Sequence, residues 1–308
     1  MEKFKYLQKI KELYANGENI FQYLRSIDNS SLNSLEDILI SYDFQAGSYI
    51  KFLSQNSEFN NNYCKTLANL INDIADVRSI IEIGVGEATT LSAVLSHLRK
   101  KPSSIFGFDI SWSRIKFAAD LLNENRVQDF KLFTANLFEI PLPDNSIDVV
   151  YTSHSIEPNG GKEKEALIEL YRITKNYLIL LEPSYEFANN EARKRMEKNG
   201  YVRNLYSTAK ELNFKVVEHR LFDFAVNPLN PTGLIIIEKG KSDYNEPELV
   251  CPITRTKLEQ HNDSFLYSNE SYLAYPILDN IPCLLKENSI LAIHLNTEYE
   301  DFKRRNQI

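Results

Sequence analysis

Apolar residues recur at helical spacing through the first seventy positions of the chain. One such set is Leu35, Ile38, Leu39 and Tyr42, and comparable sets lie before and after it. Side chains three and four positions apart share one face of a helix. The pattern predicts a helical N-terminal cap over residues 1–72, and we find no catalytic motif in it.

After this cap the pattern changes to short apolar strands that alternate with amphipathic helices. The expected strands are residues 79–83, 105–109, 130–133, 147–151 and 177–181. Such alternation is typical of a parallel sheet with helices on both faces. Ligands of these sheets bind at the carboxyl ends of the strands.

Two more strands end this region, at residues 214–217 and 234–237, and no helix fits between them. A short connection requires that the two strands run antiparallel. We therefore expect an α/β fold over residues 73–241, a Rossmann-like seven-stranded sheet with an antiparallel last strand.

A polar linker at residues 240–247 separates the sheet from the last sixty residues. We expect residues 248–308 to form a small, separate α+β domain. A chain of 308 residues is long enough for two domains.

Composition narrows the class of protein. The hydrophobic fraction of 43% and the charged fraction of 25% are typical of a soluble globular chain. Its apolar runs are too short to span a membrane, and the first residues lack the apolar core of a signal peptide. Three widely spaced cysteines, Cys64, Cys251 and Cys283, argue against a disulfide framework. We expect a cytoplasmic protein without a membrane partner.

The strongest chemical signal is the turn that follows the first strand. Gly84 and Gly86 let the backbone turn sharply and approach a ligand, and Glu82 precedes them. Asp109 ends the second strand, where a carboxylate can accept hydrogen bonds from both ribose hydroxyls. The site is therefore expected to bind a nucleoside.

The residues after this turn narrow the cofactor. No Gly-Lys-Ser/Thr follows, which excludes a P-loop, and Thr89 occupies the third position of a dinucleotide fingerprint. We expect Glu87, at the start of the next helix, to repel a pyrophosphate. S-adenosylmethionine lacks phosphate and carries cationic groups, and Glu82 could help to hold its methionine end.

These motifs, in this order, resemble the class I S-adenosylmethionine-dependent methyltransferases. The resemblance rests on Glu-Ile-Gly-Val-Gly from Glu82, on Phe-Asp-Ile-Ser around Asp109 and on the segment from Ala135. It implies that the glycine turn lies under the methionine moiety and that Asp109 binds the ribose. The cofactor-binding residues that it implies are Glu82, Gly84, Gly86, Asp109, Ile110, Asn136 and Leu137. Ala88 and Asn136 depart from the common pattern, which has Gly and Asp there.

The last segment resembles the small activator proteins of tRNA, rRNA and protein methyltransferases and their bacterial relatives. The matching residues are Cys251-Pro-Ile-Thr and the stretch from Leu273 to Leu285. Zinc-binding members carry a second cysteine where Thr254 stands here. Because Zn²⁺ requires four suitable ligands, we expect no metal.

The segment after the fourth strand supplies the catalytic candidates. His154 could take a proton from an acceptor hydroxyl, or it could merely shape the pocket. Glu157 is the second candidate, and its alternative is a solvated loop carboxylate.

The acceptor itself is not readable from the sequence. With a net charge of −7 and no signature for a nucleobase nitrogen, a small-molecule hydroxyl is the leading hypothesis. Two alternatives stay open, an RNA- or protein-modifying methyltransferase docked through its C-terminal domain and a non-catalytic S-adenosylmethionine-binding protein. The sequence is also compatible with assembly into a homo-oligomer.

Overall fold

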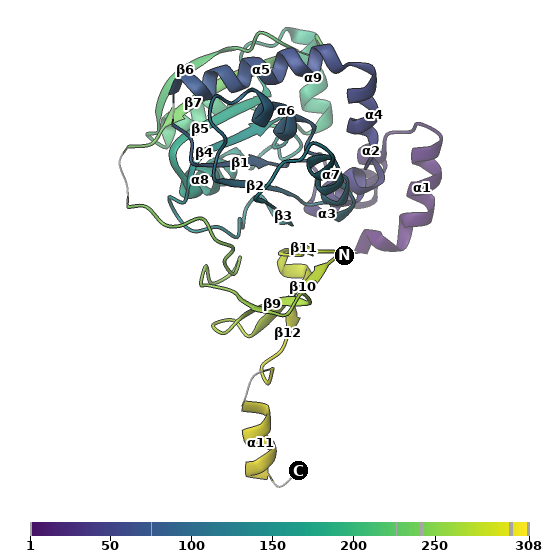
Figure 1. Ribbon diagram of the computed structural model, residues 1–308. Helices are drawn as coiled ribbons and strands as arrows, with labels where there is room; N and C mark the ends of the chain where they lie inside the picture. The colour runs from purple at the N-terminus through teal and green to yellow at the C-terminus, as the bar shows by residue number, and fades with distance from the viewer. Residues whose placement is uncertain (1, 75, 226, 241–242, 296–297, 307–308) are drawn as a thin grey trace.

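The fold is built on one large sheet, seen edge-on in Figure 1. The computed structural model describes residues 2–74, 76–225, 227–240, 243–295 and 298–306. The strand order is β3-β2-β1-β4-β5-β7-β6. The strands are β1 (Ser79–Ile83), β2 (Ser104–Asp109), β3 (Phe130–Thr134), β4 (Ile147–Ser153), β5 (Thr174–Pro183), β6 (Lys215–Leu221) and β7 (Thr232–Glu238).

The topology confirms the predicted fold class. Strands β1 to β5 pair in parallel, whereas β7 runs antiparallel to both β5 and β6. The order reverses between β1 and β4, so the switch point of the sheet lies beside the glycine turn. A ligand crevice is expected at this point.

Helices cover both faces of the sheet and bury two apolar cores. On one face α5 (Ser57–Ile74), α6 (Thr89–His97) and α7 (Trp112–Glu124) pack on the sheet, and on the other α8 (Glu163–Ile173) and α10 (Leu205–Glu211) do so. The helices α9 (Asn190–Asn199) and α10 were not among the expected elements. They connect β5 to β6.

The N-terminal cap consists of short helices, as the periodicity predicts. They are η1 (Glu2–Tyr6), α1 (Leu7–Ala15), α2 (Ile20–Asp28), α3 (Leu35–Phe44), α4 (Ser48–Gln55) and α5. Helix α3 begins in a capping box, in which the Ser34 hydroxyl and the Asp37 carboxylate each bond the other's backbone N–H. This fixed start orients α3 against α7.

The C-terminal unit, residues 248–306, is less separate than expected. Its elements are β8 (Glu259–His261), β9 (Phe265–Ser268), β10 (Leu273–Leu278), β11 (Ile281–Pro282), η2 (Lys286–Asn288), β12 (Ile290–Leu291) and α11 (Glu298–Asn306). Cys283 forms a parallel bridge with Thr134 at the end of β3, and the Leu284 N–H donates to the Thr134 carbonyl at 2.9 Å. Buried side chains of the unit, among them Tyr275, join the core of the large sheet.

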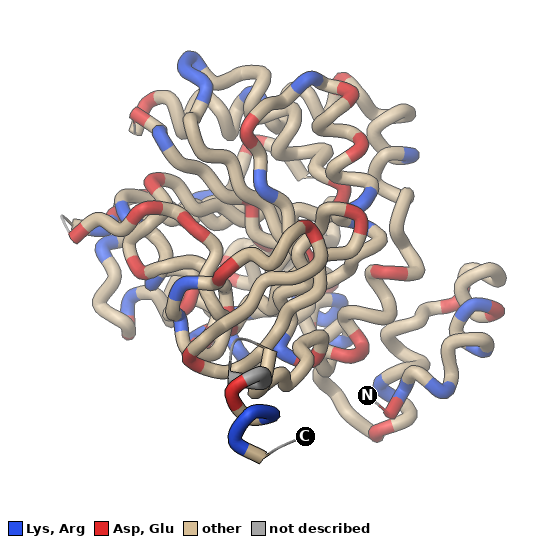
Figure 2. Tube along the Cα trace, turned by 60° about the horizontal axis from the view of Figure 1, so that its bottom comes forward, with Lys and Arg blue, Asp and Glu red and all other residues tan. Residues whose placement is uncertain are grey.

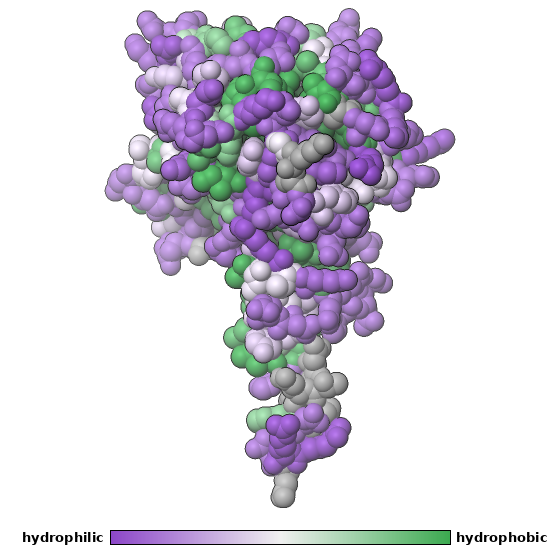
Figure 3. Space-filling view, turned by 90° about the vertical axis from the view of Figure 1, so that its left-hand side faces the viewer, coloured by the Kyte–Doolittle hydropathy of each residue, from purple (hydrophilic) through white to green (hydrophobic). Residues whose placement is uncertain are grey.

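Lys and Arg are interspersed with Asp and Glu along the chain in the view of Figure 2. Apolar side chains are exposed on the C-terminal unit, including Ile290 at 61% and Leu291 at 66%, and Figure 3 shows green patches over this unit. Every helix that the structure describes is too short or too polar to span a bilayer.

Candidate functional site

The glycine turn is as tight as its sequence predicts. Gly84 has a φ of 61°, and a Cβ added to it would lie 2.5 Å from the Cβ of Ser155. Gly86 has a φ of 54°. Ala88 adopts the same left-handed conformation, with a φ of 55°, directly before α6. Glycine adopts this region without the steric penalty that a Cβ brings, so the first two positions have a clear conformational reason to be glycine.

Asp109 locks the end of β2 to this turn. Its carboxylate accepts hydrogen bonds from the Gly86 N–H at 3.1 Å and from the Ser111 N–H at 2.9 Å. Burial raises the pKa of Asp109 above its ordinary value, although the charge of Arg114 and these N–H groups act in the opposite direction. Each carboxylate oxygen keeps a lone pair that can accept a ribose hydroxyl.

A cavity at the switch point gathers most of the predicted cofactor residues. Gly84, Asp109, Ile110, Asn136 and Leu137 all line it. It offers a glycine cradle, a carboxylate and apolar side chains, which together suit the sugar and base of a nucleoside. The individual binding roles stay predictions.

Glu82 lies behind this cavity instead of lining it. Its carboxylate accepts a hydrogen bond from the Tyr151 hydroxyl at 2.9 Å, and only 3% of the residue is exposed. Burial raises the pKa of Glu82 to about 8, against the opposing effect of the Tyr151 hydrogen bond. Its role at the methionine end stays a prediction, and a direct contact would require the carboxylate to leave Tyr151.

Glu87 does not face the ligand, which corrects our argument that it repels a pyrophosphate. Its carboxylate is fully buried and accepts hydrogen bonds from the N–H groups of Gly47 at 2.9 Å and Ile50 at 2.7 Å. These groups lie at the start of α4, where orphan N–H donors need acceptors. Glu87 therefore ties the cap to the turn.

His154 follows β4 and lines the cavity, and its catalytic role stays a prediction. Its Nδ1 lies 3.3 Å from the Glu157 carboxylate, and its Nε2 lies 2.8 Å from the Thr232 hydroxyl. A carboxylate can only accept hydrogen bonds. In the neutral ring Nδ1 therefore carries the proton, and Nε2 accepts a hydrogen bond from the Thr232 hydroxyl. Burial acts to lower the pKa of His154, but the Glu157 hydrogen bond and the charges of Glu157 and Glu182 raise it overall.

Glu182 supports this segment from the end of β5. Its carboxylate accepts hydrogen bonds from the N–H groups of Ser155 at 3.1 Å and Ile156 at 3.3 Å. Burial raises its pKa to about 7. Because Ser155 packs against Gly84, Glu182 helps to fix the wall opposite the glycine turn.

Residues of the cap complete the cavity, a role that was not predicted from their spacing in the sequence. Leu35, Ile38, Tyr42 and Tyr49 all line it. The first three belong to a periodic apolar face, and that spacing cannot distinguish a core face from a cavity wall. Arg114 also lines the cavity. It lies on the same face of α7 as the apolar residues Ala118 and Leu122, and a charged residue on an apolar face is the one sequence signal that could have identified it.

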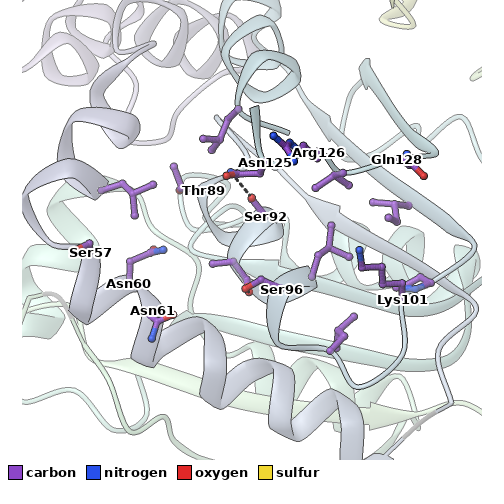
Figure 4. Close-up of a pocket in the computed structure, with 18 of the residues that line it drawn as sticks. Ser57, Asn60, Asn61, Thr89, Ser92, Ser96, Lys101, Asn125, Arg126 and Gln128 are labelled. Atoms are coloured by element: carbon purple, nitrogen blue, oxygen red, sulfur yellow. Dashed lines mark hydrogen bonds between the residues drawn. The ribbon is translucent and has the colours of Figure 1, made fainter. Parts of the chain in front are cut away.

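A second cavity, of about 1020 Å³, lies on the face covered by α5, α6 and the end of α7. Figure 4 shows Ser57, Asn60 and Asn61 on one side and the side chains of α6 on the other, with Asn125 donating to Ser92 at 2.9 Å. None of the predicted site residues lines it. This groove is therefore distinct from the candidate cofactor site.

The described residues contain no group of three or more His, Cys, Asp or Glu side chains that could hold a metal ion. Cys251 and Cys283 are both buried and free. The Cys251 sulfur lies 3.5 Å from the hydroxyls of Ser271 and Tyr275. These hydrogen bonds, with those of Thr254, lower the pKa of Cys251 to about 6 despite burial, which acts to raise it.

The sheet order, the glycine turn and the second-strand carboxylate together define a class I methyltransferase domain. Residues 81–181 match the family model described as "Methyltransferase domain". The matched range contains the turn, Asp109 and His154. The chain thus contains an S-adenosylmethionine-dependent methyltransferase domain, and its cofactor is S-adenosylmethionine.

Two curated proteins resemble different parts of the chain. The tRNA N(3)-methylcytidine methyltransferase trm140 of Schizosaccharomyces pombe is 24% identical over 179 residues, which are 50% of this chain and 56% of that protein. The chain thus spans little more than half the length of this relative. A UPF0434 protein of Neisseria meningitidis is 50% identical over 46 residues, which are 15% of this chain and 75% of that protein. Through this segment the chain belongs to the UPF0434 family.

One solved structure resembles the fold. It is a chain from the complex between the Haloferax volcanii Trm112 methyltransferase activator and a methyltransferase. The TM-score is 0.50 at 15% identity, with 64% of this chain and 96% of that chain covered. At this identity the likeness shows the fold alone.

Proposed function

We propose that this protein transfers the methyl group of S-adenosylmethionine to the hydroxyl of a small molecule. The observation that carries the proposal is the cap over the cavity. Leu35, Ile38 and Tyr42 line the same space as Gly84 and His154. An apolar wall with a few polar groups is typical of a small-molecule site.

The cofactor supplies an electrophilic methyl group on a sulfonium when it is bound. The task left to the protein is to hold an acceptor oxygen in line and to accept its proton. His154 is suited to the second task because Glu157 fixes the tautomer that leaves Nε2 free of a proton. The Thr232 hydroxyl occupies the place at Nε2 that an acceptor hydroxyl would take.

When bound, the cofactor would supply the methyl group for the new C–O bond, and its sulfonium would leave as a neutral thioether. The hydroxyl proton moves to Nε2 of His154, and the charge of the imidazolium is balanced by Glu157. The net charge of the reacting groups is conserved. Glu157 acts through the histidine and is a positioning residue.

A transfer assay with S-adenosylmethionine labelled on its methyl group tests the proposal. The full chain is incubated with a low-molecular-mass metabolite extract or with bulk tRNA. Label in small metabolites that is lost in His154→Ala supports the proposal, because general-base assistance is worth about 10²–10⁴ in rate. Label in tRNA alone overturns it. Cofactor binding without transfer to either pool supports a non-catalytic binding protein.

A second candidate is RNA methylation, which the tRNA methyltransferase relative favours. A basic cluster on α9, with Lys194 and Lys198 exposed, is the surface that we would assign to RNA. Yet Figure 1 places α9 at the opposite end of the molecule from the C-terminal unit. The basic cluster on α9 and the C-terminal unit therefore do not form one continuous surface on which RNA could dock. The tRNA arm of the assay decides between the two candidates.

A further inference from the structure

Arg114 is a buried cation in the first turn of α7, and neither the family match nor the sequence motifs give it a role. Only 1% of the residue is exposed. Its guanidinium lies over the ring of Tyr49, 4.3 Å from the centroid, and over that of Tyr42 at 5.0 Å. Its Nε–H donates to the Tyr42 carbonyl at 2.9 Å.

The far end of this guanidinium has no hydrogen-bond partner. Both Nη1 and Nη2 are buried, and neither donates a hydrogen bond within the described structure. The nearest carboxylate oxygen, Oε1 of Glu87, is 3.5 Å from Nη1 and already accepts from the Gly47 N–H. Glu87 therefore gives Nη1 a charge partner, but neither Nη1 nor Nη2 has a hydrogen-bond acceptor, and burying N–H donors without acceptors is costly.

Arg114 lies beside the glycine turn, at the edge of the cofactor cavity. Arg114 is one of the lining residues. Its Nη1 lies 3.5 Å from the position that a Cβ of Gly86 would occupy. Asp109, which we assign to the ribose, is close enough for the charge of Arg114 to oppose the rise in its pKa. Arg114 thus lies beside both the glycine turn and the carboxylate that we assign to the ribose.

We propose that Arg114 binds the carboxylate of the methionine moiety of S-adenosylmethionine, with Tyr49 and Tyr42 holding the guanidinium in place. This carboxylate is the one anionic group of the cofactor. A planar guanidinium whose two NH₂ groups lack acceptors matches a carboxylate in geometry and charge. The inference concerns the cofactor alone and holds for either acceptor class.

A merely structural Arg114 would give a different result from a carboxylate-binding one. Through Tyr42 and Glu87 the side chain also connects α7 to the cap, so its loss could loosen the cavity. A loosened cavity would weaken every nucleoside ligand alike. A lost carboxylate contact would weaken only ligands that carry the carboxylate.

Calorimetric titration of the full chain with two ligands separates these cases. S-adenosylhomocysteine carries the carboxylate, whereas 5′-methylthioadenosine lacks the whole amino-acid end. For Arg114→Met we expect at least about thirtyfold weaker binding of the first and less than about threefold change for the second. Lys116→Met, on the same helix with an exposed side chain, is the matched control and should change neither affinity.

Other outcomes overturn the inference. An equal loss for both ligands in Arg114→Met would make Arg114 a structural residue, and unchanged affinities would make it irrelevant to the cofactor. Arg114→Lys guards against a folding failure. Since lysine keeps the charge, this variant should retain part of the preference for S-adenosylhomocysteine over 5′-methylthioadenosine, and complete loss of that preference with intact methylthioadenosine binding would count against a charge contact with the carboxylate. Failure of the wild-type chain to bind either ligand would instead contradict the cofactor assignment.

Discussion

The N-terminal cap and the C-terminal unit pack on the same sheet but serve the cavity differently. The cap places side chains in it, among them Tyr42 and Tyr49. None of the residues described in the C-terminal unit lines it. The unit contacts both ends of the segment 134–141, through the Leu284 N–H on Thr134 and the Val250 N–H on Pro141 at 3.0 Å. That segment contains Asn136 and Leu137, so the unit supports a wall of the cavity.

The difference shows that a region can matter to a site without touching its ligand. The cap acts on the binding site directly, because its aromatic rings and backbone N–H groups hold Arg114 and Glu87 beside the glycine turn. The C-terminal unit contributes position, because Cys283 extends the sheet beside Thr134. Variants of the cap should therefore alter cofactor affinity first, and variants of the C-terminal unit should alter stability first.

Truncation of Leu284 should give the largest effect. This side chain is 1% exposed and lies in the core beneath β3. Leu284→Ala should reduce the free energy of unfolding by about 2–5 kcal/mol. Denaturant titration measures this loss. Leu278→Ala, in the same unit but 53% exposed, should cost little. Equal effects in the two variants would contradict the shared core.

Glu82 lies in β1, outside both the cap and the C-terminal unit, and its contribution to stability should depend on pH. Its pKa is about 8 in the folded chain and close to 4.5 in the unfolded chain. The folded state holds the proton more tightly, so stability is full below about pH 4.5 and declines as the pH rises to about 8. Glu82→Gln should remove this decline, at about 1.4 kcal/mol per pH unit. Thermal melts from pH 5 to 9 check it, and identical pH profiles for variant and wild type would refute it.

Tyr49 is the sharpest probe of the cap. Tyr49→Ala removes the ring over Arg114 and the contact with Gly86. We expect roughly tenfold weaker binding of S-adenosylhomocysteine, measured by calorimetry, with the melting temperature nearly unchanged. Tyr14→Ala, an exposed position of the cap, serves as the control. A large drop in stability without a change in affinity would contradict our view that the cap affects cofactor binding before it affects stability.

The smallest effect should be a shift in the pH dependence of transfer. Nε2 of His154 accepts a proton only when the ring is neutral, so activity should rise with pH through a pKa above about 6.5. Glu157→Gln removes the carboxylate that raises the pKa of His154, and the rise in activity should move to lower pH. The pH profile of kcat/KM shows the shift. An unchanged pH profile would show that Glu157 does not influence the group whose titration controls activity.

The sheet and the glycine turn could be predicted because their signals are local. Apolar runs define the strands, and the conformations of Gly84 and Gly86 follow from the turn itself. The cavity wall from the cap could not be predicted, because Leu35 and Ile38 have the spacing of any core face. Glu87 was misinterpreted since its partners, such as Gly47, lie forty positions away. Long-range partners leave no local pattern.

Binding of S-adenosylhomocysteine to the full chain and to Asp109→Ala tests the central claim most directly. The account predicts one site in the wild-type chain by calorimetry and at least about thirtyfold weaker binding in the variant, because the ribose loses its carboxylate. Asp109→Asn, which keeps an acceptor, should fall between the two. Equal affinity in all three chains, or tighter binding of NADH than of S-adenosylhomocysteine to the wild type, would contradict it.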